Sequence, residues 1–254
     1  MLIALTQAVP PSIVHCELTH LEREAIDLAR ATEQHRRYEE ALAELGCTLQ
    51  RLPPTPELPD SVFVEDTAVV LPEIAVIARP GAESRRTEVA LVAEALRPYR
   101  RLAFIEAPGT LDGGDVLCLG SRIWVGLSAR TNAEGIRQLQ SIVSGLGYEV
   151  RSLTVTGCLH LKTAVTQGGE RTVLLNPAWI SASAFDGLDH VEVHPAEPFG
   201  ANALRVGEVL LYPAAFPRTR ERLEERGFTV RTIEADELAK AEAGLTCCSV
   251  FVAV

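Results

Sequence analysis

Two adjacent thiols, an imidazole and several carboxylates lie in short polar stretches of this sequence, and these are the side-chain types used in nucleophilic catalysis. The thiols belong to Cys247 and Cys248 in "LTCC", and the imidazole belongs to His160 in "LHLK". A thiolate is a soft nucleophile, and an imidazole can carry a proton near neutral pH. The expected chemistry is attack by a cysteine on an electron-poor carbon, with acid–base catalysis by a histidine.

Each of these residues also has an ordinary structural interpretation. An unbonded cysteine is often just a small buried apolar side chain. His160 lies between Leu159 and Leu161, which are surroundings typical of a core histidine. Neighbouring side chains of a strand point to opposite faces, so only one of Cys247 and Cys248 is expected to face a pocket. The residues alone do not choose between the two thiols.

The polar stretches occupy equivalent places in a repeat. Each comes directly before the first strand of an expected β-hairpin: "FVED" ending at Asp66, "LDGGD" ending at Asp115, "LHLK" around His160, "GAN" ending at Asn202, and "LTCC". Units related by rotation place equivalent positions around one axis, at one end of it. The sequence therefore predicts a central pocket in which thiol, imidazole and carboxylate groups converge, and this convergence favours catalysis over core packing.

Repeated strand and helix units must position these residues. Paired apolar runs with turn residues between them mark four hairpins, at 66–78, 115–127, 163–176 and 204–214. A helix ending in glycine and a short alternating strand recur about every forty to fifty residues. The copies are "LGCTLQRL", "LGYEVRSL" and "RGFTVRTI", with weaker versions in "YRRLAFIEAP" and "LDHVEVHP".

Two of the expected helices have clear signals. The segment 31–45 is amphipathic through Tyr38, Ala41, Leu42 and Leu45. The segment starting at Thr131 has Glu134 at capping-box spacing, followed by an apolar stripe of Ile136, Leu139, Ile142 and Val143.

A fifth hairpin can come only from the two ends of the sequence, "MLIALTQ" and "CCSVFVAV". Their pairing closes a ring of five units and removes exposed sheet edges. We therefore predict one α/β domain over residues 1–254, a five-bladed α/β propeller with pseudo-five-fold ββαβ repeats, closed by the N- and C-terminal strands. The alternative is a doubly wound parallel sheet, which does not account for the repeated hairpins.

Composition limits the class of protein. With 47% hydrophobic and 23% charged residues among 254, the chain is expected to be a soluble globular protein. A net charge of −10, with arginines interleaved with glutamates, argues against a nucleic-acid partner. The first apolar run is broken by Thr6, Gln7 and two prolines, so we expect no signal peptide, no membrane span and a cytoplasmic location. Six cysteines without a C-x-x-C pair disfavour disulfides and zinc knuckles.

Several longer motifs, in order, resemble one known family. They are "PDSVFVED", "RPGAESRR", "APGTLDGGD", "SARTNAEG", "LHLKT", "FPRTRE" and "GLTCCSV". The sequence resembles dimethylarginine dimethylaminohydrolase, a member of the guanidino-group-modifying pentein superfamily, over nearly the whole chain and most weakly at 154–200. The resemblance implies a five-bladed fold and Cys247 as the nucleophile. It also implies hydrolysis of asymmetric dimethylarginine or monomethylarginine to L-citrulline and dimethylamine or methylamine, through a covalent amidino-thioether.

The resemblance also implies roles for the other site residues. His160 would protonate the leaving amine and then deprotonate water, beside Asp112. Carboxylates would contact the cationic guanidinium, and the matching positions are Asp66, Asp112 and, in the same motif as Asp66, Glu65. Arg85 and Arg130 would bind the carboxylate of the substrate. Asp60 and the carbonyls of Leu18 and Ala241 would accept hydrogen bonds from its ammonium. Leu18 would belong to a loop that could cover the pocket.

No cofactor and no metal are implied. The expected partner is the small-molecule substrate alone, with no nucleic acid and no membrane, and the chain is expected to be a monomer or a homodimer. Carboxylates near Cys247 would raise the pKa of its thiol. Its ionisation would then need the substrate's positive charge or an ion pair with His160, and the sequence does not choose between them. Without the resemblance, Arg85 would be interpreted as a solvated charge at a helix start.

The sequence departs from its relatives at two places. Some relatives carry glutamate where this chain has Asp112, and the His-x-Asp motif of arginine deiminases is replaced by "HLK", with Lys162. The second departure favours the methylarginine branch. The alternatives are an arginine deiminase, a non-catalytic ribosome-binding propeller, which would not need this set of residues, and a zinc site at His160 and Cys247, where two ligands are too few.

Overall fold

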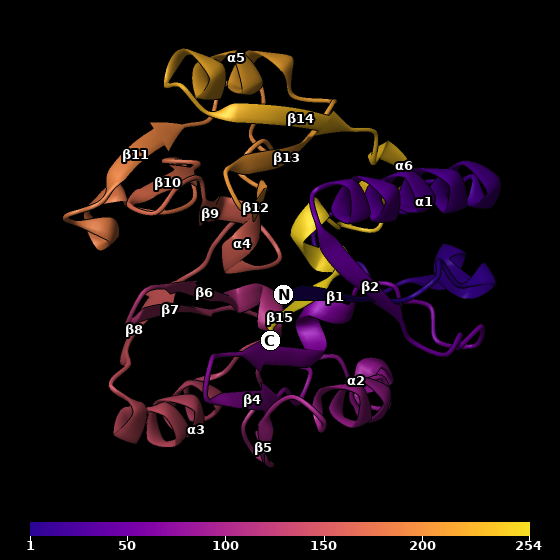
Figure 1. Ribbon diagram of the computed structural model, residues 1–254, viewed down its shortest axis with the longest axis vertical. Coiled ribbons are helices and arrows are strands. Elements are labelled where there is room, and N and C mark those ends of the chain that lie inside the picture. Colours follow the sequence, from indigo (N-terminus) through magenta and orange to yellow (C-terminus); the bar gives the residue numbers. More distant parts are fainter.

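Five three-stranded sheets surround one axis in the computed structural model, which describes residues 1–254 (Figure 1). Four of these sheets, or blades, follow one another along the chain. Their strands are β3 (Ala68–Val70), β4 (Ile74–Ile77) and β5 (Arg101–Phe104); β6 (Val116–Leu119), β7 (Arg122–Leu127) and β8 (Glu149–Thr154); β9 (Val165–Gln167), β10 (Thr172–Leu175) and β11 (Asp189–Glu192); and β12 (Leu204–Val206), β13 (Val209–Pro213) and β14 (Thr229–Ile233).

The same connectivity repeats in every blade. The first strand pairs antiparallel with the middle strand, and the third strand pairs parallel with it after a crossover. In four blades the crossover contains an α-helix: α1 (Leu28–Glu44), α2 (Val89–Leu96), α3 (Ala133–Val143) and α5 (Pro217–Glu225). These are the predicted ββαβ repeats, and the fold class is confirmed. The crossover of the β10 blade contains only the 3-10 helix η6 (Ala182–Phe185).

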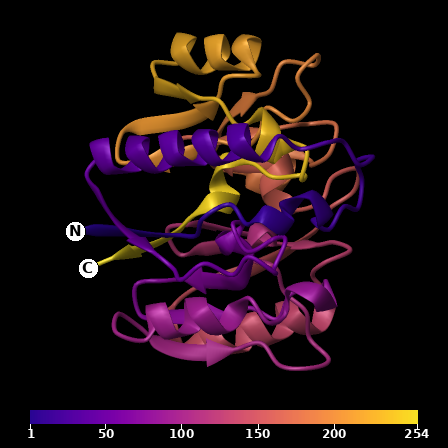
Figure 2. The same cartoon turned by 90° about the vertical axis from the view of Figure 1, so that its right-hand side faces the viewer.

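The fifth blade joins the two ends of the chain. Strand β15 (Val250–Ala253) pairs antiparallel with β1 (Leu2–Thr6), which pairs parallel with β2 (Cys47–Arg51). The ammonium of Met1 donates a hydrogen bond of 2.7 Å to the carbonyl of Val254, and Figure 2 shows the two ends side by side. The predicted pairing of the terminal strands is therefore confirmed. The expected loss of sheet edges is wrong, because the five sheets stay separate and each keeps its own two edges.

Glycines end three of the crossovers, as the repeated phrase predicts. Gly46, Gly147 and Gly227 have φ values of 90°, 85° and 84°, in the left-handed region that favours glycine, and each precedes the third strand of its blade. The start of α3 differs from the prediction. Its N-cap is Asn132, whose side chain accepts from the N–H of Gly135 at 2.8 Å, and the capping box at Thr131 does not form.

Apolar side chains between neighbouring blades form the core. One cluster packs Leu5 and Val252 of the β1 blade against Ile77, Val92 and Leu96 of the β4 blade. Similar clusters fill the other spaces between blades. Because every blade packs against its neighbours, the innermost ends of all five blades are held at fixed positions around the axis. No helix is long and apolar enough to cross a membrane.

The remaining short elements lie at blade ends and loops. Directly before the first strands come η2 (Val64–Thr67), η4 (Gly113–Asp115), α4 (Leu161–Ala164) and η7 (Leu245–Cys248). The others are η1 (Pro11–His15), η3 (Glu83–Arg85), η5 (Ser144–Leu146) and α6 (Asp236–Ala239). The first four carry or adjoin the polar stretches that the sequence singles out.

Candidate active site

The helical turns that precede the first strands pack against one another near the axis. η2 contacts both η4 and η7, and α4 contacts η4. Asp66 comes from η2, Asp112 is the residue before η4, His160 precedes α4, and Cys247 belongs to η7. Five-fold repetition thus brings together residues separated by up to 181 positions in sequence. The side chains of Asp66, Asp112 and His160 lie close together, and the turn that carries Cys247 packs against the turn that carries Asp66.

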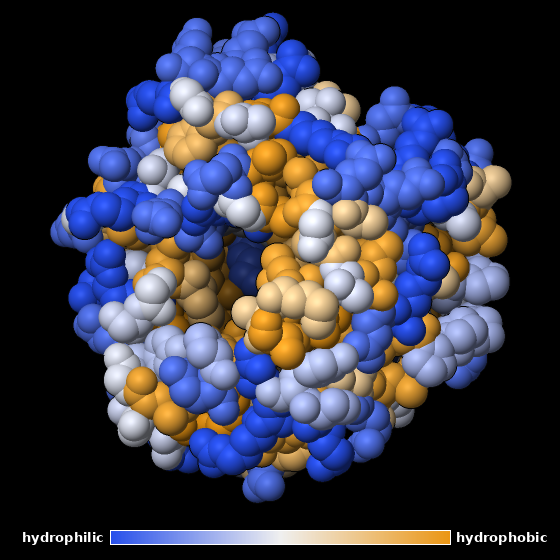
Figure 3. All heavy atoms as spheres, viewed as in Figure 1, coloured by the Kyte–Doolittle hydropathy of each residue, from blue (hydrophilic) through white to orange (hydrophobic).

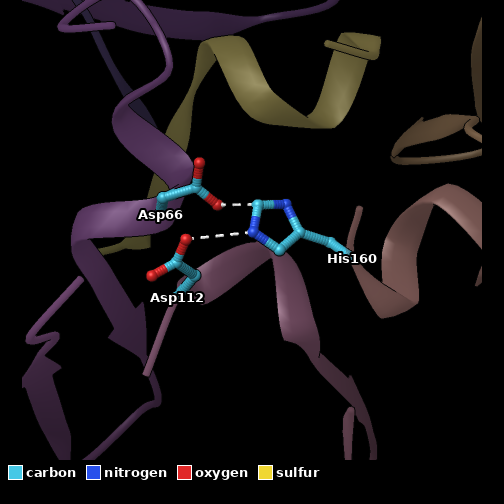
Figure 4. Close-up of side chains that lie close together, drawn as sticks. All are labelled: Asp66, Asp112 and His160. Atoms are coloured by element: carbon cyan, nitrogen blue, oxygen red, sulfur yellow. Dashed lines mark hydrogen bonds and ion pairs between the residues drawn. The ribbon is translucent and has the colours of Figure 1, made fainter. Parts of the chain in front are cut away.

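His160 lies between two buried aspartates (Figure 4). Its Nε2 is 3.0 Å from Oδ2 of Asp112, and its Nδ1 is 3.7 Å from Oδ1 of Asp66. Gly114 makes this approach possible, because a Cβ there would lie 2.7 Å from both Asp66 Oδ1 and His160 Nδ1. The N–H of Gly114 also donates to Asp66 at 3.0 Å, and the N–H of Gly81 donates to Asp112 at 2.9 Å.

The two carboxylates control the protonation of His160. Burial alone would lower the pKa of His160, but Asp66 and the hydrogen bond to Asp112 outweigh it and raise the pKa to about 9. Burial would likewise raise the pKa of Asp66, but His160 and Arg85 lower it to about 2. At neutral pH the group is therefore an imidazolium held between carboxylates, so His160 carries a proton that it can donate.

Arg85 and Arg130 meet the same two carboxylates. Arg85 is buried; its Nη1 donates to Asp66 Oδ2 at 2.5 Å, and its Nε and Nη2 face Glu88 at 3.1 and 2.9 Å. Its Nη2 also donates to the carbonyls of Asp60 and Phe63. The interpretation of Arg85 as a solvated charge is therefore wrong. In this arrangement protein groups occupy most donors of Arg85.

Arg130 is bound less completely than Arg85. Its Nη1 is 3.7 Å from Asp112 Oδ2, and its Nη2 donates to the hydroxyl of Thr19 at 3.2 Å. Of the two arginines that the resemblance assigns to the substrate carboxylate, Arg130 is the one with more donor capacity left for a ligand.

The two thiols lie in the 3-10 turn η7, so strand alternation is not what separates them. Cys248 is buried in the core between the β1 blade and α1, whereas Cys247 is partly exposed and its Sγ accepts from the N–H of Gly244 at 3.3 Å. Burial, Glu65 and Asp66 raise the pKa of Cys247 to about 12, although Gly244 and Lys162 oppose the increase. Without a ligand Cys247 is therefore a protonated thiol near the carboxylates of Glu65 and Asp66.

An ion pair between Lys162 and Glu65 lies at the inner end of the site. Lys162 Nζ is 2.6 Å from Glu65 Oε1, and the hydroxyl of Thr246 donates to Glu65 Oε2 at 2.7 Å. Asn202 bonds to Thr246 in turn. On the other side of this network, a cavity of about 240 Å³ is lined by the first strands of the five blades. Figure 3 shows a hollow near the centre of that face, with hydrophilic residues at its bottom and hydrophobic residues around it.

The residues assigned to the substrate's ammonium lie at the edge of the site. Asp60 is buried and accepts the N–H of Glu17 at 3.1 Å, which fixes the residue before Leu18. Leu18 is partly buried against the same core as Ala241, which is buried directly after α6. The segment around Leu18 thus lies against Asp60 and Arg130, as a covering loop would.

Sequence reasoning missed three parts of the site. The roles of Lys162 and Thr246 in holding Glu65, and of Glu88 in holding Arg85, depend on contacts between blades or within a buried turn. The only available signals were their places next to motif residues, two after His160, one before Cys247 and three after Arg85. None of these places predicts a bonding partner.

One further geometric feature concerns cations. Ligand atoms of Asp66, Asp112 and His160 lie within 4.8 Å of one another. Both carboxylates already face guanidinium groups, Asp66 that of Arg85 and Asp112 that of Arg130. This set differs from the zinc pair of His160 and Cys247 that the sequence suggested as an alternative.

Comparison with known proteins agrees with this fold. A dimethylarginine dimethylaminohydrolase of Streptomyces coelicolor is 41% identical over 249 residues, covering 97% of this chain and 95% of the relative. The Pseudomonas aeruginosa enzyme of that name is 36% identical over 225 residues, 88% of this chain and 89% of the relative. No protein-family model matches the sequence.

Solved structures show the same relationship. A cysteine-to-serine variant of the Pseudomonas aeruginosa enzyme in complex with citrulline superposes with a TM-score of 0.93, at 35% identity over 98% of both chains. The N-terminal domain of ArgZ, an arginine dihydrolase, has a TM-score of 0.89 at 21% identity over 99% of this chain and 97% of its own, which shows the fold alone. The fold and its central polar site define a pentein of the guanidino-group-modifying kind. Within that class, the chain belongs to the dimethylarginine dimethylaminohydrolase family.

Proposed function

We propose that this protein is a hydrolase that converts N-methylated L-arginine and water to L-citrulline and dimethylamine or methylamine. Family membership over nearly the whole chain supports this activity. The observation that carries the mechanism is the position of the His160 ring, which lies between Asp66 and Asp112 in the same cluster of turns as Cys247. The arginine dihydrolase structures share the fold at about 20% identity and do not support arginine as the substrate.

Cys247 is the proposed nucleophile. A guanidinium carbon is a poor electrophile toward water, and a covalent intermediate divides the reaction into two easier steps. The thiol is protonated in the free site, since burial, Glu65 and Asp66 raise its pKa to about 12. A cationic guanidinium next to Cys247 would offset those carboxylates and lower that pKa. Ionisation assisted by the substrate therefore fits this site better than a standing ion pair.

His160 is the proposed proton carrier. As the cationic substrate binds, the thiol of Cys247 gives its proton to solvent water, because His160 is already protonated. The thiolate then adds to the guanidinium carbon, the imidazolium gives its proton to the departing methylamine, and the carbon–nitrogen bond breaks. The neutral imidazole then accepts a proton from water as the water's oxygen adds to the amidino-thioether carbon. The carbon–sulfur bond breaks, the hydroxyl proton of the intermediate passes to the departing thiolate, and L-citrulline forms. Asp112 fixes the ring through Nε2, and Asp66 and Glu65 are assigned to the cationic intermediate.

The α-carboxylate and the α-ammonium of the substrate each need protein groups of opposite charge or polarity. We assign its carboxylate to Arg130, with the remaining donor capacity of Arg85, and its ammonium to Asp60 and the carbonyls of Leu18 and Ala241. Small-molecule binding alone is proposed, with no cofactor. A single domain over residues 1–254, a cytoplasmic location and a monomeric or homodimeric state stay predictions from the sequence.

One assay tests the function. Dimethylarginine, monomethylarginine, arginine and agmatine are incubated with the protein in parallel, and citrulline, carbamoylputrescine and the released amines are measured. We expect citrulline from the methylated substrates, little from arginine, and no product from agmatine, which lacks the carboxylate. Release of ammonia from arginine at the highest rate would replace the proposal with a deiminase. Turnover of agmatine as fast as methylarginine would refute the carboxylate assignment.

A further inference from the structure

A single carboxylate holds the segment that crosses the edge of the site. Residues 17–27 contain no helix or strand, and most of their side chains are exposed. The side chain of Glu242 accepts the backbone N–H of Thr19 at 3.1 Å and those of His20 and Leu21 at 2.5 Å. Three consecutive N–H groups that converge on one point form an anion-binding arrangement, and here the anion is a side chain of the protein itself.

The backbone of Glu242 gives an independent indication. Its φ is 59°, and it is the only residue other than glycine with a positive φ. L-residues adopt this left-handed conformation at a cost that glycine does not have. A glutamate at a position that favours glycine indicates that its side chain is needed there.

The segment has limited apolar support, since Leu18 and Ile26 are its side chains that pack, partly buried, against a hydrophobic core. His20, Leu21 and Glu242 lie on the wall of a cavity of about 550 Å³. The segment contacts the site through the N–H of Glu17 with Asp60 and the hydroxyl of Thr19 with Arg130. Away from the site, Arg23 donates to the carbonyls of Val14 and Cys16, and Lys240 donates to the carbonyl of Ala25. The position of the intervening residue, Leu18, therefore depends on its partial burial and on polar contacts, among which Glu242 accepts three successive N–H groups.

We infer that Glu242 is a positioning residue that latches residues 17–21 and thereby fixes the distance between the carbonyls of Leu18 and Ala241. Ala241 is the neighbour of Glu242 in the chain, so one residue connects both carbonyls that are assigned to the substrate's ammonium. Glu242 touches no reacting atom. This inference rests on the proposed function for its substrate and on the hydrogen bonds above for its geometry.

The decisive variant is Glu242→Gly, which removes the latch and relieves the left-handed backbone. Because three hydrogen bonds to a charged group are lost, we expect KM for methylarginine to rise about tenfold or more, with kcat within about threefold. Amide hydrogen exchange at Thr19, His20 and Leu21 should become faster, while the melting temperature stays the same or increases. Glu234→Gln is the matched control, because Glu234 is exposed on the same cavity wall and makes no hydrogen bond.

A second substrate separates positioning from a general structural effect. In an analogue of methylarginine with hydrogen in place of the α-ammonium, KM should be the same for the wild type and Glu242→Gly. An equal increase in KM for both substrates, an unchanged KM for methylarginine, or an equal effect of Glu234→Gln would each overturn the inference. If the wild type hydrolysed no methylarginine, the proposed function would fail, and hydrogen exchange would still test the latch.

Discussion

At the scale of single residues, burial distinguishes the two thiols more clearly than the sequence can. Cys248 belongs to the core, and Cys247 is partly exposed beside the carboxylates of Glu65 and Asp66. The two thiols have different surroundings, as predicted, but strand alternation is not the reason, because both residues lie in a 3-10 turn. Neighbouring side chains of such a turn also point in different directions. The turn could not be recognised from the sequence, because the apolar run that follows it predicts a strand.

Cys247→Ser should abolish citrulline formation, because an alcohol in this acidic setting is a much weaker nucleophile than a thiolate. Cys248→Ser should keep most of the activity and lose some stability, since it places a hydroxyl in an apolar core. Mass spectrometry after trapping with substrate should locate the adduct on Cys247. Equal loss of activity in the two variants would contradict this assignment.

The protonation of His160 should make the free energy of unfolding depend on pH. Its pKa is raised from 6.5 to about 9 in the folded protein, so its contribution is fully present below pH 6.5 and is lost as pH rises through about 9. A difference of this size corresponds to on the order of 3 kcal/mol. Asp66, with a pKa lowered to about 2, contributes above about pH 4 and loses its contribution below that.

The measurement is the free energy of unfolding in denaturant at several pH values, for the wild type and His160→Gln. The stability difference between them should shrink between pH 6.5 and pH 10. A difference that is constant over this range would show that His160 is neutral in the folded protein.

At the scale of elements, the short turns before the first strands define the site, and they were only partly predictable. The motifs marked where Asp66, His160 and Cys247 occur, because each precedes a recognisable hairpin. They did not show where the side chains point. The direction of Arg85 depends on Glu88, which lies one helical turn away, and the start of α3 at Asn132 depends on a loop that aligns the amide oxygen of Asn132 with Gly135.

Arg85 and Arg130 should therefore differ when replaced. Arg85→Leu leaves Glu88 buried without a counter-ion and Asp66 with His160 alone, so we expect it to lower the free energy of unfolding by about 3–5 kcal/mol. Arg130→Leu loses a looser contact with Asp112 and should mainly raise KM for methylarginine. Denaturant unfolding and steady-state kinetics on both variants check this. Similar stability losses in the two would contradict the distinction.

At the scale of the whole molecule, the repeat was the most predictable feature. Period, hairpin turns and crossover glycines are local properties, and together they fixed the number and order of blades. The weakest copy, between β10 and β11, has η6 where the others have an α-helix, which explains why its signal is poor. The separate sheet edges were not predictable, because side-chain packing between blades, rather than strand pairing, holds the ring together.

Because the blades form a ring, we expect the protein to fold with its chain termini moved to another position. β1 and β15 pair as the hairpin strands of the other blades do, except that no turn joins them. A permuted chain, with Val254 linked to Met1 by a short turn and opened between Gly207 and Glu208, should fold and keep its activity. Both residues at the opening are exposed, in the turn between β12 and β13. Circular dichroism and the citrulline assay test this, and an unfolded permutant would mean that this hairpin must be continuous.

The pairing of β1 with β15 also determines when the fifth blade can form during synthesis of the chain. A ribosome makes Leu2–Thr6 before Val250–Ala253, with roughly 250 residues between them, which takes on the order of tens of seconds at ordinary translation rates. Until then the edge of β1 that receives β15 is unpaired. Cys247 emerges with the same late segment, three residues before β15. A nascent chain therefore has the acidic groups and the imidazole before it has the thiol of Cys247, so the reaction proposed for that thiol cannot begin before the ring can close.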